Sequence, residues 1–419
     1  MTISDRHAPR PDRADGDSRS MTVILAAGAV VLALSFGVRT VFGGVLEPIS
    51  TEFGWSRETF SLSLAIQNLF WGVAQPFFGA LADKFGDRRA LWLGLGCYVV
   101  GMLMTITGAT PLAMHAGAGL LVGAGIAGTA FGVVLSVVGR AAPEEKRSQY
   151  LGLVVALGST GQAVIPVVAG WLTAAYGWQA MLGVMTVLLL GIAACIPFLR
   201  APETAAQEAA ADGTASADAP PLFTTLGAAF ESASYNLLIA GFFVCGFHLA
   251  FIAVHFPAFV NEMCGDPALG LQALGVVGLA NIAGSYAAGW LAGRFPKQYL
   301  LSAIYALRAL VIFLFISFPV TPFSVIVFAL AIGPLWLSTV PLTSGLVAGM
   351  FGPRYMGTLW GFVFLSHQMG SFLGVWLGGR LYDLYNSYDI VWWVAIALGI
   401  ASAIVHLPIR EQRSERALA

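Results

Sequence analysis

One arginine, Arg39, lies deep inside an apolar run that extends from Met21 to Glu47. At about 1.5 Å per residue, a helix over this run is roughly 40 Å long and crosses a hydrocarbon core of about 30 Å with some tilt. A guanidinium at such depth costs on the order of 2.5–3.5 kcal/mol on insertion scales, so it is expected to face protein or a watery cavity and not lipid. The chemistry open to it there is the binding of an anionic substrate.

Other polar side chains lie close to the centres of apolar runs, and Arg308 lies midway along one of them. The neutral ones are Asn68, Gln162, His248, Asn281, His367 and Gln368. A buried amide or imidazole is costly unless it is paired, so each is expected either to line a substrate site or to bridge two helices. For Arg308 two interpretations stay open: carbonyls and polar side chains satisfy it within the protein, or it reaches a cavity and binds substrate.

His367 has the clearest pattern for a substrate site with a titratable group. Trp360, Phe364 and Ser371 share its helical face at spacings of seven, three and four residues, which gives an aromatic wall beside an imidazole. A similar stripe, which either lines the site or packs as aromatic core, consists of Trp336, Thr339 and Thr343.

Proton coupling requires a titratable group inside the membrane. No Asp or Glu lies in the interior of an apolar run, and Glu47 and Glu262 are at outer ends. Histidine titrates in the useful range. Coupling is therefore expected through His367, His248 or His255, or through protonation of the substrate itself.

Twelve apolar runs position these side chains, and each is long enough to cross a membrane as a helix. They cover residues 21–47, 59–81, 90–109, 113–138, 148–175, 179–199, 234–260, 271–292, 299–317, 322–350, 356–381 and 389–408. With 58% hydrophobic residues, 10% charged residues and a mean hydropathy of +0.79, the composition indicates an integral membrane protein. The net charge of −1 gives no reason to expect nucleic acid as a partner.

The order of the runs predicts an all-α membrane protein with five segments. These are a disordered cytoplasmic tail at 1–20, a six-helix bundle at 21–199, a cytoplasmic linker at 200–233, a second six-helix bundle at 234–408 and a cytoplasmic tail at 409–419. In this arrangement 17 of the 21 Lys and Arg residues fall on the side of the N-terminus. The positive-inside rule therefore predicts that both termini are cytoplasmic, at the inner membrane of the cell.

An internal repeat supports the division into two halves. Gly79–Gly86, at the end of the second run, is echoed by Gly289–Pro296 at the end of the eighth, with an offset of 210 residues. Gly170–Tyr176 and Gly379–Tyr385 repeat with an offset of 209 residues. Two pseudo-symmetric halves with a substrate site near the midplane are a known plan of transporters.

The stretch GALADKFGDRR at 79–89 resembles the cytoplasmic loop signature of the major facilitator superfamily, G-x-x-x-D-[RK]-x-G-x-[RK]-[RK]. The resemblance implies twelve transmembrane helices in two six-helix halves. It also implies that the aspartate contacts the N-terminus of the eleventh helix, near Met356, as a conformational latch, and a carboxylate is favourable there. The latch residues are then Gly79, Asp83, Gly86, Arg88 and Arg89. The alternative is a loop that is merely positive on the inside.

The first two runs resemble those of the monocarboxylate transporters and their bacterial relatives, which include oxalate/formate exchangers. Arg39 falls where animal monocarboxylate carriers have a lysine that is implicated in proton and substrate coupling. Those carriers also have an Asp and an Arg four residues apart in the eighth helix, and the corresponding residues here are Asn281 and Ser285. The expected anion clamp is absent, so lactate or pyruvate does not follow from the resemblance, and Arg308 replaces the clamp only if it reaches the cavity.

Three functions are weighed on these grounds. The first is a secondary transporter of a small organic anion, which is expected to be a monocarboxylate. If transport is coupled to protons, it is expected to be a symport. The substrate site is expected at Arg39, Asn68, Gln162, Asn281, Arg308, Trp336 and His367. The second is an efflux carrier for apolar or cationic compounds, although Gly161 and Pro166 are not the adjacent Gly-Pro pair of drug/proton antiporters. The third is a non-transporting sensor on the same fold.

An enzyme is not expected, because the chain has no phosphate-binding loop, metal-ligand cluster or nucleophile elbow. No cofactor or metal is expected either, and the chain is expected to be a monomer in the bilayer.

Overall fold

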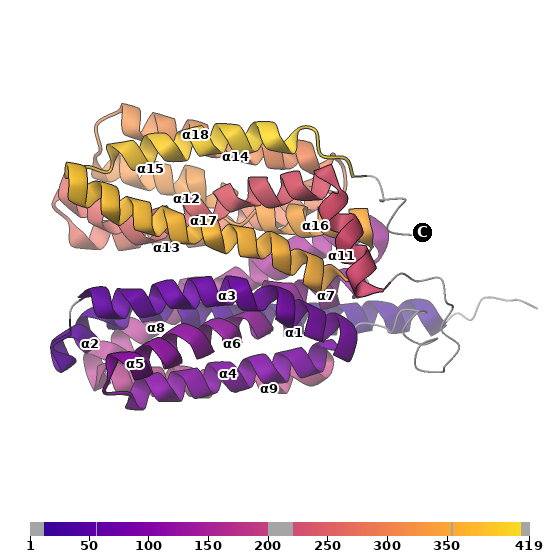
Figure 1. Ribbon diagram of the computed structural model, residues 1–419, viewed down its shortest axis with the longest axis horizontal. Coiled ribbons are helices and arrows are strands. Elements are labelled where there is room, and N and C mark those ends of the chain that lie inside the picture. Colours follow the sequence, from indigo (N-terminus) through magenta and orange to yellow (C-terminus); the bar gives the residue numbers. More distant parts are fainter. Residues whose placement is uncertain (1–11, 56, 200–220, 353–354, 412–419) are drawn as a thin grey trace, which may run out of the picture.

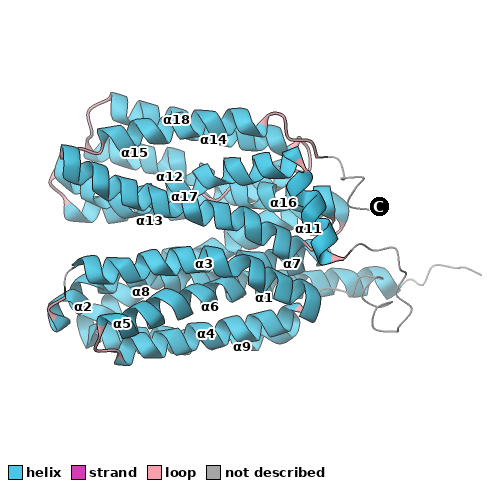
Figure 2. Ribbon diagram, viewed as in Figure 1, coloured by secondary structure: helices cyan, strands magenta, loops and turns pink. Residues whose placement is uncertain are grey.

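The computed structural model describes residues 12–55, 57–199, 221–352 and 355–411, and within these ranges every regular element is a helix (Figure 2). Figure 1 shows the helices side by side along the long axis of the molecule, with the N-terminal half (indigo to magenta) below the C-terminal half (red to yellow). The prediction of an all-α membrane fold is confirmed. The expected tail 1–20 and linker 200–233 lie partly outside the described residues.

The N-terminal half follows the predicted order of six crossings. Its elements are α1 (Asp12–Thr40), η1 (Val41–Val45), α2 (Leu46–Phe53), α3 (Arg57–Phe85), α4 (Asp87–Thr107), α5 (Pro111–Met114), the π-helix η2 (His115–Leu121), α6 (Val122–Thr129), α7 (Phe131–Ala141), η3 (Glu144–Lys146), α8 (Arg147–Leu189), α9 (Gly191–Cys195) and η4 (Ile196–Phe198). α8 contains two crossings, because the chain bends at Gly177, where φ is 84°. α1 begins at Asp12, inside the segment expected to be a disordered tail.

The C-terminal half has the same plan. Its elements are α11 (Leu222–Glu231), α12 (Ala233–Cys264), α13 (Pro267–Leu291), α14 (Lys297–Ser317), α15 (Pro322–Ile332), η5 (Gly333–Leu335), α16 (Thr339–Phe351), α17 (Met356–Tyr385) and α18 (Asp389–His406). α11 lies within the expected linker. The tenth crossing is interrupted, since η5 and residues 336–338 separate α15 from α16.

Ten spans within the described residues are long and apolar enough to cross a membrane. The two remaining predicted crossings, α3 and α17, have 29 and 30 residues and carry more polar side chains. These two helices pack against each other between the halves. Their polar residues therefore lie at the interface of the two halves, where they find partners.

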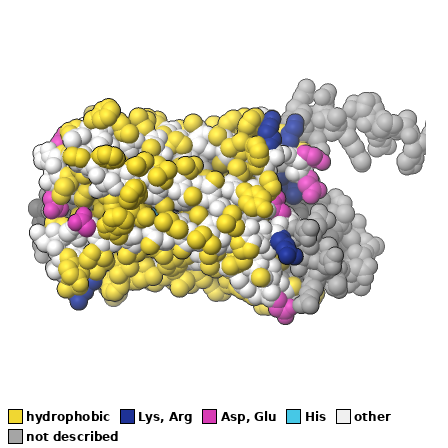
Figure 3. All heavy atoms as spheres, turned by 90° about the horizontal axis from the view of Figure 1, so that it is seen from above, with side chains coloured by type: hydrophobic (Ala, Val, Ile, Leu, Met, Phe, Trp, Pro, Cys, Tyr) yellow, Lys and Arg dark blue, Asp and Glu magenta, His cyan; other side chains and the backbone are white. Residues whose placement is uncertain are grey.

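The surface agrees with a bilayer-spanning protein. Figure 3 shows hydrophobic side chains along the side of the molecule, with Lys, Arg, Asp and Glu at its two ends. Large apolar side chains more than half exposed include Phe77, Trp92, Trp171, Trp376 and Trp393. Outward-facing apolar groups of this kind suit contact with lipid tails.

Basic residues distinguish the two ends. The end at which α3 meets α4 and α17 begins is called the basic end below. Its described basic residues are Lys84, Arg88, Arg89, Arg140, Lys146, Arg147, Arg294, Lys297 and Arg410.

Close helix crossings depend on glycine. Gly152 of α8 and Gly289 of α13 approach so closely that a methyl group on Gly152 would lie 2.8 Å from the Gly289 Cα. Gly161 of α8 lies against the Ala33 carbonyl of α1, and a methyl group there would overlap that oxygen. Gly79 of α3, the first residue of the repeated loop sequence, lies equally close to Gly357 of α17, and a methyl group on Gly79 would overlap the Gly357 carbonyl. The helices can approach this closely only because these positions carry no side chain.

We predict that Gly161→Ala lowers the apparent melting temperature of the protein in detergent by at least about 3 °C, since overpacking of this kind costs about 1–3 kcal/mol. The matched control is Gly170→Ala on the same helix, where a methyl group meets no atom within 4 Å. Equal melting temperatures for the two variants would contradict this account of the α1–α8 crossing.

Candidate functional site

The last turn of α1 carries Arg39 into the space between the halves. Its Nη2 donates a hydrogen bond to Asn68 Oδ1 on α3 at 2.5 Å. The guanidinium carbon lies 5.0 Å from the ring centre of Trp71, in a cation–π contact. The Arg39 Nε is buried and has no hydrogen-bond partner among the described atoms. The guanidinium is therefore held by neutral groups and keeps a free donor.

A chain of hydrogen bonds leads from Asn68 to the other half. The backbone carbonyl oxygen of Asn68 accepts a hydrogen bond from Gln368 Nε2 of α17 at 3.0 Å. Gln368 Oε1 lies 3.1 Å from His367 Nδ1 and accepts a hydrogen bond from Ser371 Oγ at 3.2 Å. The predicted site residues Arg39, Asn68 and His367 are thus brought into one polar chain across the interface.

An aromatic layer lies beside this chain, on the side of the basic end. Phe36, Trp71, Phe131 and Phe364 are each at most 5% exposed. The ring centres of Trp71 and Phe364 are 4.7 Å apart, and those of Phe36 and Phe131 are 4.5 Å apart. The Phe364 ring stacks on His367 with centres 5.1 Å apart. In this conformation a dry layer therefore separates the polar chain from the basic end.

The loop signature lies at the basic end, where Asp83 reaches the N-terminus of α17. Its Oδ2 accepts hydrogen bonds from the Thr358 backbone N–H at 2.8 Å and from Thr358 Oγ1 at 2.7 Å, and Oδ1 accepts one from the Gly357 N–H at 3.3 Å. These contacts join the halves. Gly86, with a φ of 95°, makes the turn from α3 into α4.

The cation beside Asp83 is Arg140, at the end of α7. Arg140 Nη1 lies 3.5 Å from Asp83 Oδ1, and Arg140 Nη2 lies 2.5 Å from Asp87 Oδ1. Arg140 was not among the predicted latch residues, although its place just after the fourth predicted span was a usable signal. Arg88, predicted for this cluster, instead donates to the Pro197 carbonyl at 2.6 Å, and Arg89 is exposed.

Burial changes the titration of Asp83, which lies two residues beyond the span expected at 59–81. Removal from water raises the pKa of its carboxyl to about 6. The charge of Arg140 and the hydrogen bonds from Thr358 lower the pKa, but they do not offset the loss of hydration.

Two predicted site residues, Arg308 and His248, form hydrogen bonds with backbone carbonyls of neighbouring crossings. Arg308 is 1% exposed, and its guanidinium donates to the carbonyls of Leu335 and Trp336. These contacts correspond to the interpretation in which carbonyls satisfy Arg308 within the protein. His248 is also 1% exposed, and its Nε2 lies 2.7 Å from the Ala395 carbonyl oxygen of α18.

The remaining predicted residues have different surroundings. Asn281 bridges α13 to Ser159 of α8, with Nδ2 donating to Oγ at 3.0 Å. Gln162 and Trp336 are partly buried. His255 Nε2 lies 2.9 Å from the Val375 carbonyl oxygen. Contact of Gln162, Trp336 or Asn281 with a substrate stays a prediction.

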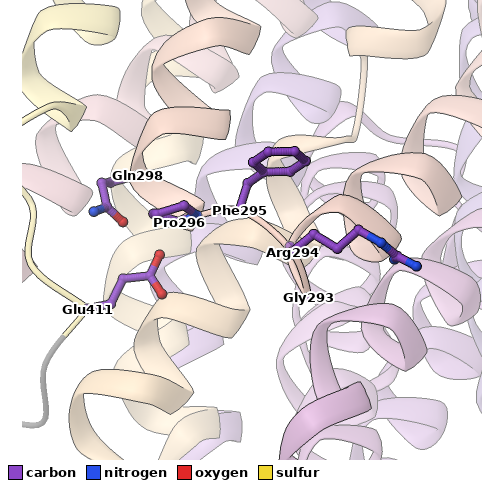
Figure 4. Close-up of a pocket in the computed structure, with 7 residues that line it drawn as sticks. Gly293, Arg294, Phe295, Pro296, Gln298 and Glu411 are labelled. Atoms are coloured by element: carbon purple, nitrogen blue, oxygen red, sulfur yellow. The ribbon is translucent and has the colours of Figure 1, made fainter.

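A pocket of about 420 Å³ opens at the basic end, at the second copy of the loop repeat. Figure 4 shows Gln298 and Glu411 at one side of it, while the Arg294 side chain extends away. Glu411 pairs with Lys297 Nζ at 3.1 Å and accepts the Lys297 backbone N–H. This contact holds the end of the described chain against the start of α14. Among the described residues, no group of three His, Cys, Asp or Glu side chains is arranged to hold a metal ion.

Comparison with protein families gives one match that covers most of the chain. The model of the family described as "Major Facilitator Superfamily" matches residues 28–373. The uncharacterized MFS-type transporter YcxA of Bacillus subtilis is 24% identical over 381 residues, which are 88% of this chain and 90% of YcxA.

Two other relatives match with similar identity. Monocarboxylate transporter 11 of Mus musculus is 23% identical over 92% of this chain and 86% of its own. The multidrug resistance protein MdtH of Photorhabdus laumondii is 25% identical over 92% of this chain and 93% of its own.

Two solved structures share the fold. A variant of the Escherichia coli fucose:proton symporter FucP superposes with a TM-score of 0.69 at 16% identity, over 93% of this chain and 99% of its own. The proton:xylose symporter XylE superposes with a TM-score of 0.72 at 12% identity, over 96% and 99%.

The raised pKa of Asp83 predicts that acid favours closure of the basic end. In an open arrangement water reaches the carboxyl, and its pKa returns toward 3.8. The closed arrangement, with a pKa of about 6, thus favours the protonated form, and this advantage is lost as the pH rises through about 6. We expect the closed-to-open ratio to rise about tenfold between pH 8 and pH 5.

Distances between spin labels on either side of the basic end measure this ratio. Asp83→Asn, which is neutral at both pH values, should remove the pH dependence. A ratio that does not change with pH in the unaltered protein, or one that rises equally in Asp83→Asn, would show that Asp83 is not the responsible group.

Proposed function

The chain belongs to the Major Facilitator Superfamily, a family of membrane transporters and not of enzymes, and we propose that it carries a small organic monoanion, a monocarboxylate, across the membrane. Transport proceeds by alternating access between the two halves, and the anion pairs with Arg39. The site also includes His367 and Asn68, with Gln162 and Trp336 as further lining residues.

The observation that carries the proposal is the state of the Arg39 guanidinium. It lies between the halves, its hydrogen-bond partner Asn68 is neutral, and its Nε has no partner among the described residues. A buried charge without a counterion is costly, and an arriving carboxylate supplies both the opposite charge and the missing acceptor. One cation held in this way favours one negative charge on the substrate.

The neighbouring polar groups limit what else the substrate carries. The Asn68 amide already bonds to Arg39 and to the Leu64 carbonyl, and the Gln368 amide bonds to the Asn68 backbone carbonyl and to His367. The layer beneath them is aromatic. These surroundings favour a carboxylate with a small apolar body over a polyol, whose many hydroxyl groups need many partners.

We include proton coupling through His367 in the proposal. Gln368 and Asn68 link this imidazole to Arg39 by hydrogen bonds, and Phe364 shields one face of it. A proton on His367 then adds a second positive charge beside the substrate. His248, which bonds to Ala395 within its own half, is the weaker candidate for this role.

The second candidate is an efflux carrier for apolar or cationic compounds. The aromatic layer of Phe36, Trp71, Phe131 and Phe364 favours it, as does the similarity to MdtH. Arg39 opposes it for cations, since a positively charged substrate would meet an uncompensated guanidinium.

We also propose that the basic end faces the cytoplasm, because it carries most of the described Lys and Arg side chains. The Asp83 latch and the aromatic layer then close the cytoplasmic side, and the conformation is outward-facing. In this proposal the protein works as a monomer in the inner membrane.

Uptake into proteoliposomes tests the function. We expect labelled monocarboxylates to enter, and Arg39→Ala to lower the uptake rate about tenfold or more, the effect of losing a charge-assisted hydrogen bond of about 1.5–3 kcal/mol. The matched control is Arg380→Gln, which removes a positive charge from an exposed position of α17 and should leave uptake within about twofold.

An inward proton gradient should stimulate uptake in the unaltered protein and not in His367→Gln. Transport of carboxylates by Arg39→Ala at the unaltered rate would overturn the proposed role of Arg39. Export of a cationic dye, with no uptake of any carboxylate, would favour the second candidate.

A further inference from the structure

The interruption of the tenth crossing leaves backbone groups without helical partners in the middle of the bundle. α15 ends at Ile332, and α16 begins at Thr339. Pro334 lies within the interruption and has no N–H to donate. In a membrane interior each freed carbonyl and N–H must find another partner within the protein.

Arg308 of α14 holds the freed carbonyls. Its Nε and Nη2 donate to the Leu335 carbonyl at 3.0 and 2.5 Å, and Nη2 also donates to the Trp336 carbonyl at 2.5 Å. Its Nη1 lies 3.4 Å from Cys245 Sγ. The planar fork of an arginine suits two adjacent carbonyls. Arg308 therefore fixes the interruption from one side.

Asn281 of α13 holds the same segment from the other side. Its Oδ1 accepts the Leu337 backbone N–H at 2.8 Å and the Ser285 hydroxyl at 3.1 Å. Gly284, one turn along α13, lies against Pro334 so closely that a methyl group would overlap the Pro334 carbonyl. The interruption is thus fitted to α13 by shape as well as by hydrogen bonds.

The same Asn281 amide also reaches the other half of the protein. Its Nδ2 donates to Ser159 Oγ on α8 at 3.0 Å, and the two residues are 1% and 3% exposed. The Ser159 hydroxyl in turn donates to the Val155 carbonyl at 2.9 Å. One buried side chain therefore contacts both the interruption of the tenth crossing and the opposing half.

We propose that Asn281 and Arg308 are positioning residues for transport, which make the segment 333–338 a hinge coupled to the separation of the two halves. While α8 and α13 are together, Ser159 orients the Asn281 amide and the amide holds the Leu337 N–H. When the halves part at this level, Asn281 loses Ser159, its hold on Leu337 weakens, and the hinge loosens around Arg308. The inference depends on movement of the halves and not on which substrate is carried.

Hydrogen exchange of the peptide that contains residues 333–338 tests the coupling in the full-length protein in nanodiscs. We expect Ser159→Ala to raise the exchange rate about three- to tenfold, the effect of losing one buried hydrogen bond. The matched control is Ser285→Ala, which removes a bond to the same Asn281 oxygen without separating the halves, and it should change the rate less than twofold.

A second variant acts at a distance. Gly79→Val at the basic end prevents closure against Gly357 and should raise exchange at 333–338, although residue 79 has no part in the hinge. Spin-label distances verify that this variant is open. An unchanged rate in an open Gly79→Val protein, or an equal rise in Ser159→Ala and Ser285→Ala, would overturn the coupling.

Transport kinetics separate positioning from binding. Ser159→Ala should change the maximal rate of uptake and leave the equilibrium dissociation constant of the substrate within about twofold. A change confined to the dissociation constant would make the Asn281 region part of the substrate site and would contradict the proposal.

Discussion

Polar groups inside a bilayer have no water to bind, and this constraint decides where the two halves of the protein touch. Gln368 is satisfied by the Asn68 backbone carbonyl and Asn281 by Ser159, and beyond the span, at the basic end, Asp83 is satisfied by the N–H groups of Gly357 and Thr358; each pair joins one half to the other. These hydrogen bonds can be broken and remade with water or with other protein groups when the halves move, whereas the aromatic contact between Trp71 and Phe364 has to be uncovered. Such an interface suits a protein whose halves must move.

Arg39 departs from this pattern of satisfied polar groups. Arg308 is also an arginine inside a membrane span, but carbonyls of the tenth crossing accept its hydrogen bonds. Within the described part of the chain, Arg39 has a neutral partner, an aromatic neighbour and a buried Nε without a partner. This difference between two membrane arginines separates a structural role from a binding role, and it supports a substrate that brings the negative charge.

Much of the architecture could be predicted from the sequence, because membrane crossings follow directly from hydropathy and the loop signature identifies Asp83. The partners of the polar residues could not. The run 322–350 contains the helix-breaking pair Gly333–Pro334, but hydropathy gives it as one crossing and does not show that the freed carbonyls bind Arg308. Arg140 became the partner of Asp83 only through the packing of α7 on α3, while Arg88 turned toward Pro197. Pairings across helices depend on rotation and register, which hydropathy does not contain.

The central claim is that Arg39 recognises a negative charge, and a ligand pair of equal shape tests it most directly. The measurement is the equilibrium binding of a monocarboxylate and of its neutral amide to the purified protein, read as the shift of the melting temperature with ligand concentration. The account predicts that the carboxylate binds at least about tenfold more tightly than the amide, and that Arg39→Gln abolishes this preference. Equal binding of the two ligands to the unaltered protein, or an undiminished preference in Arg39→Gln, would contradict it.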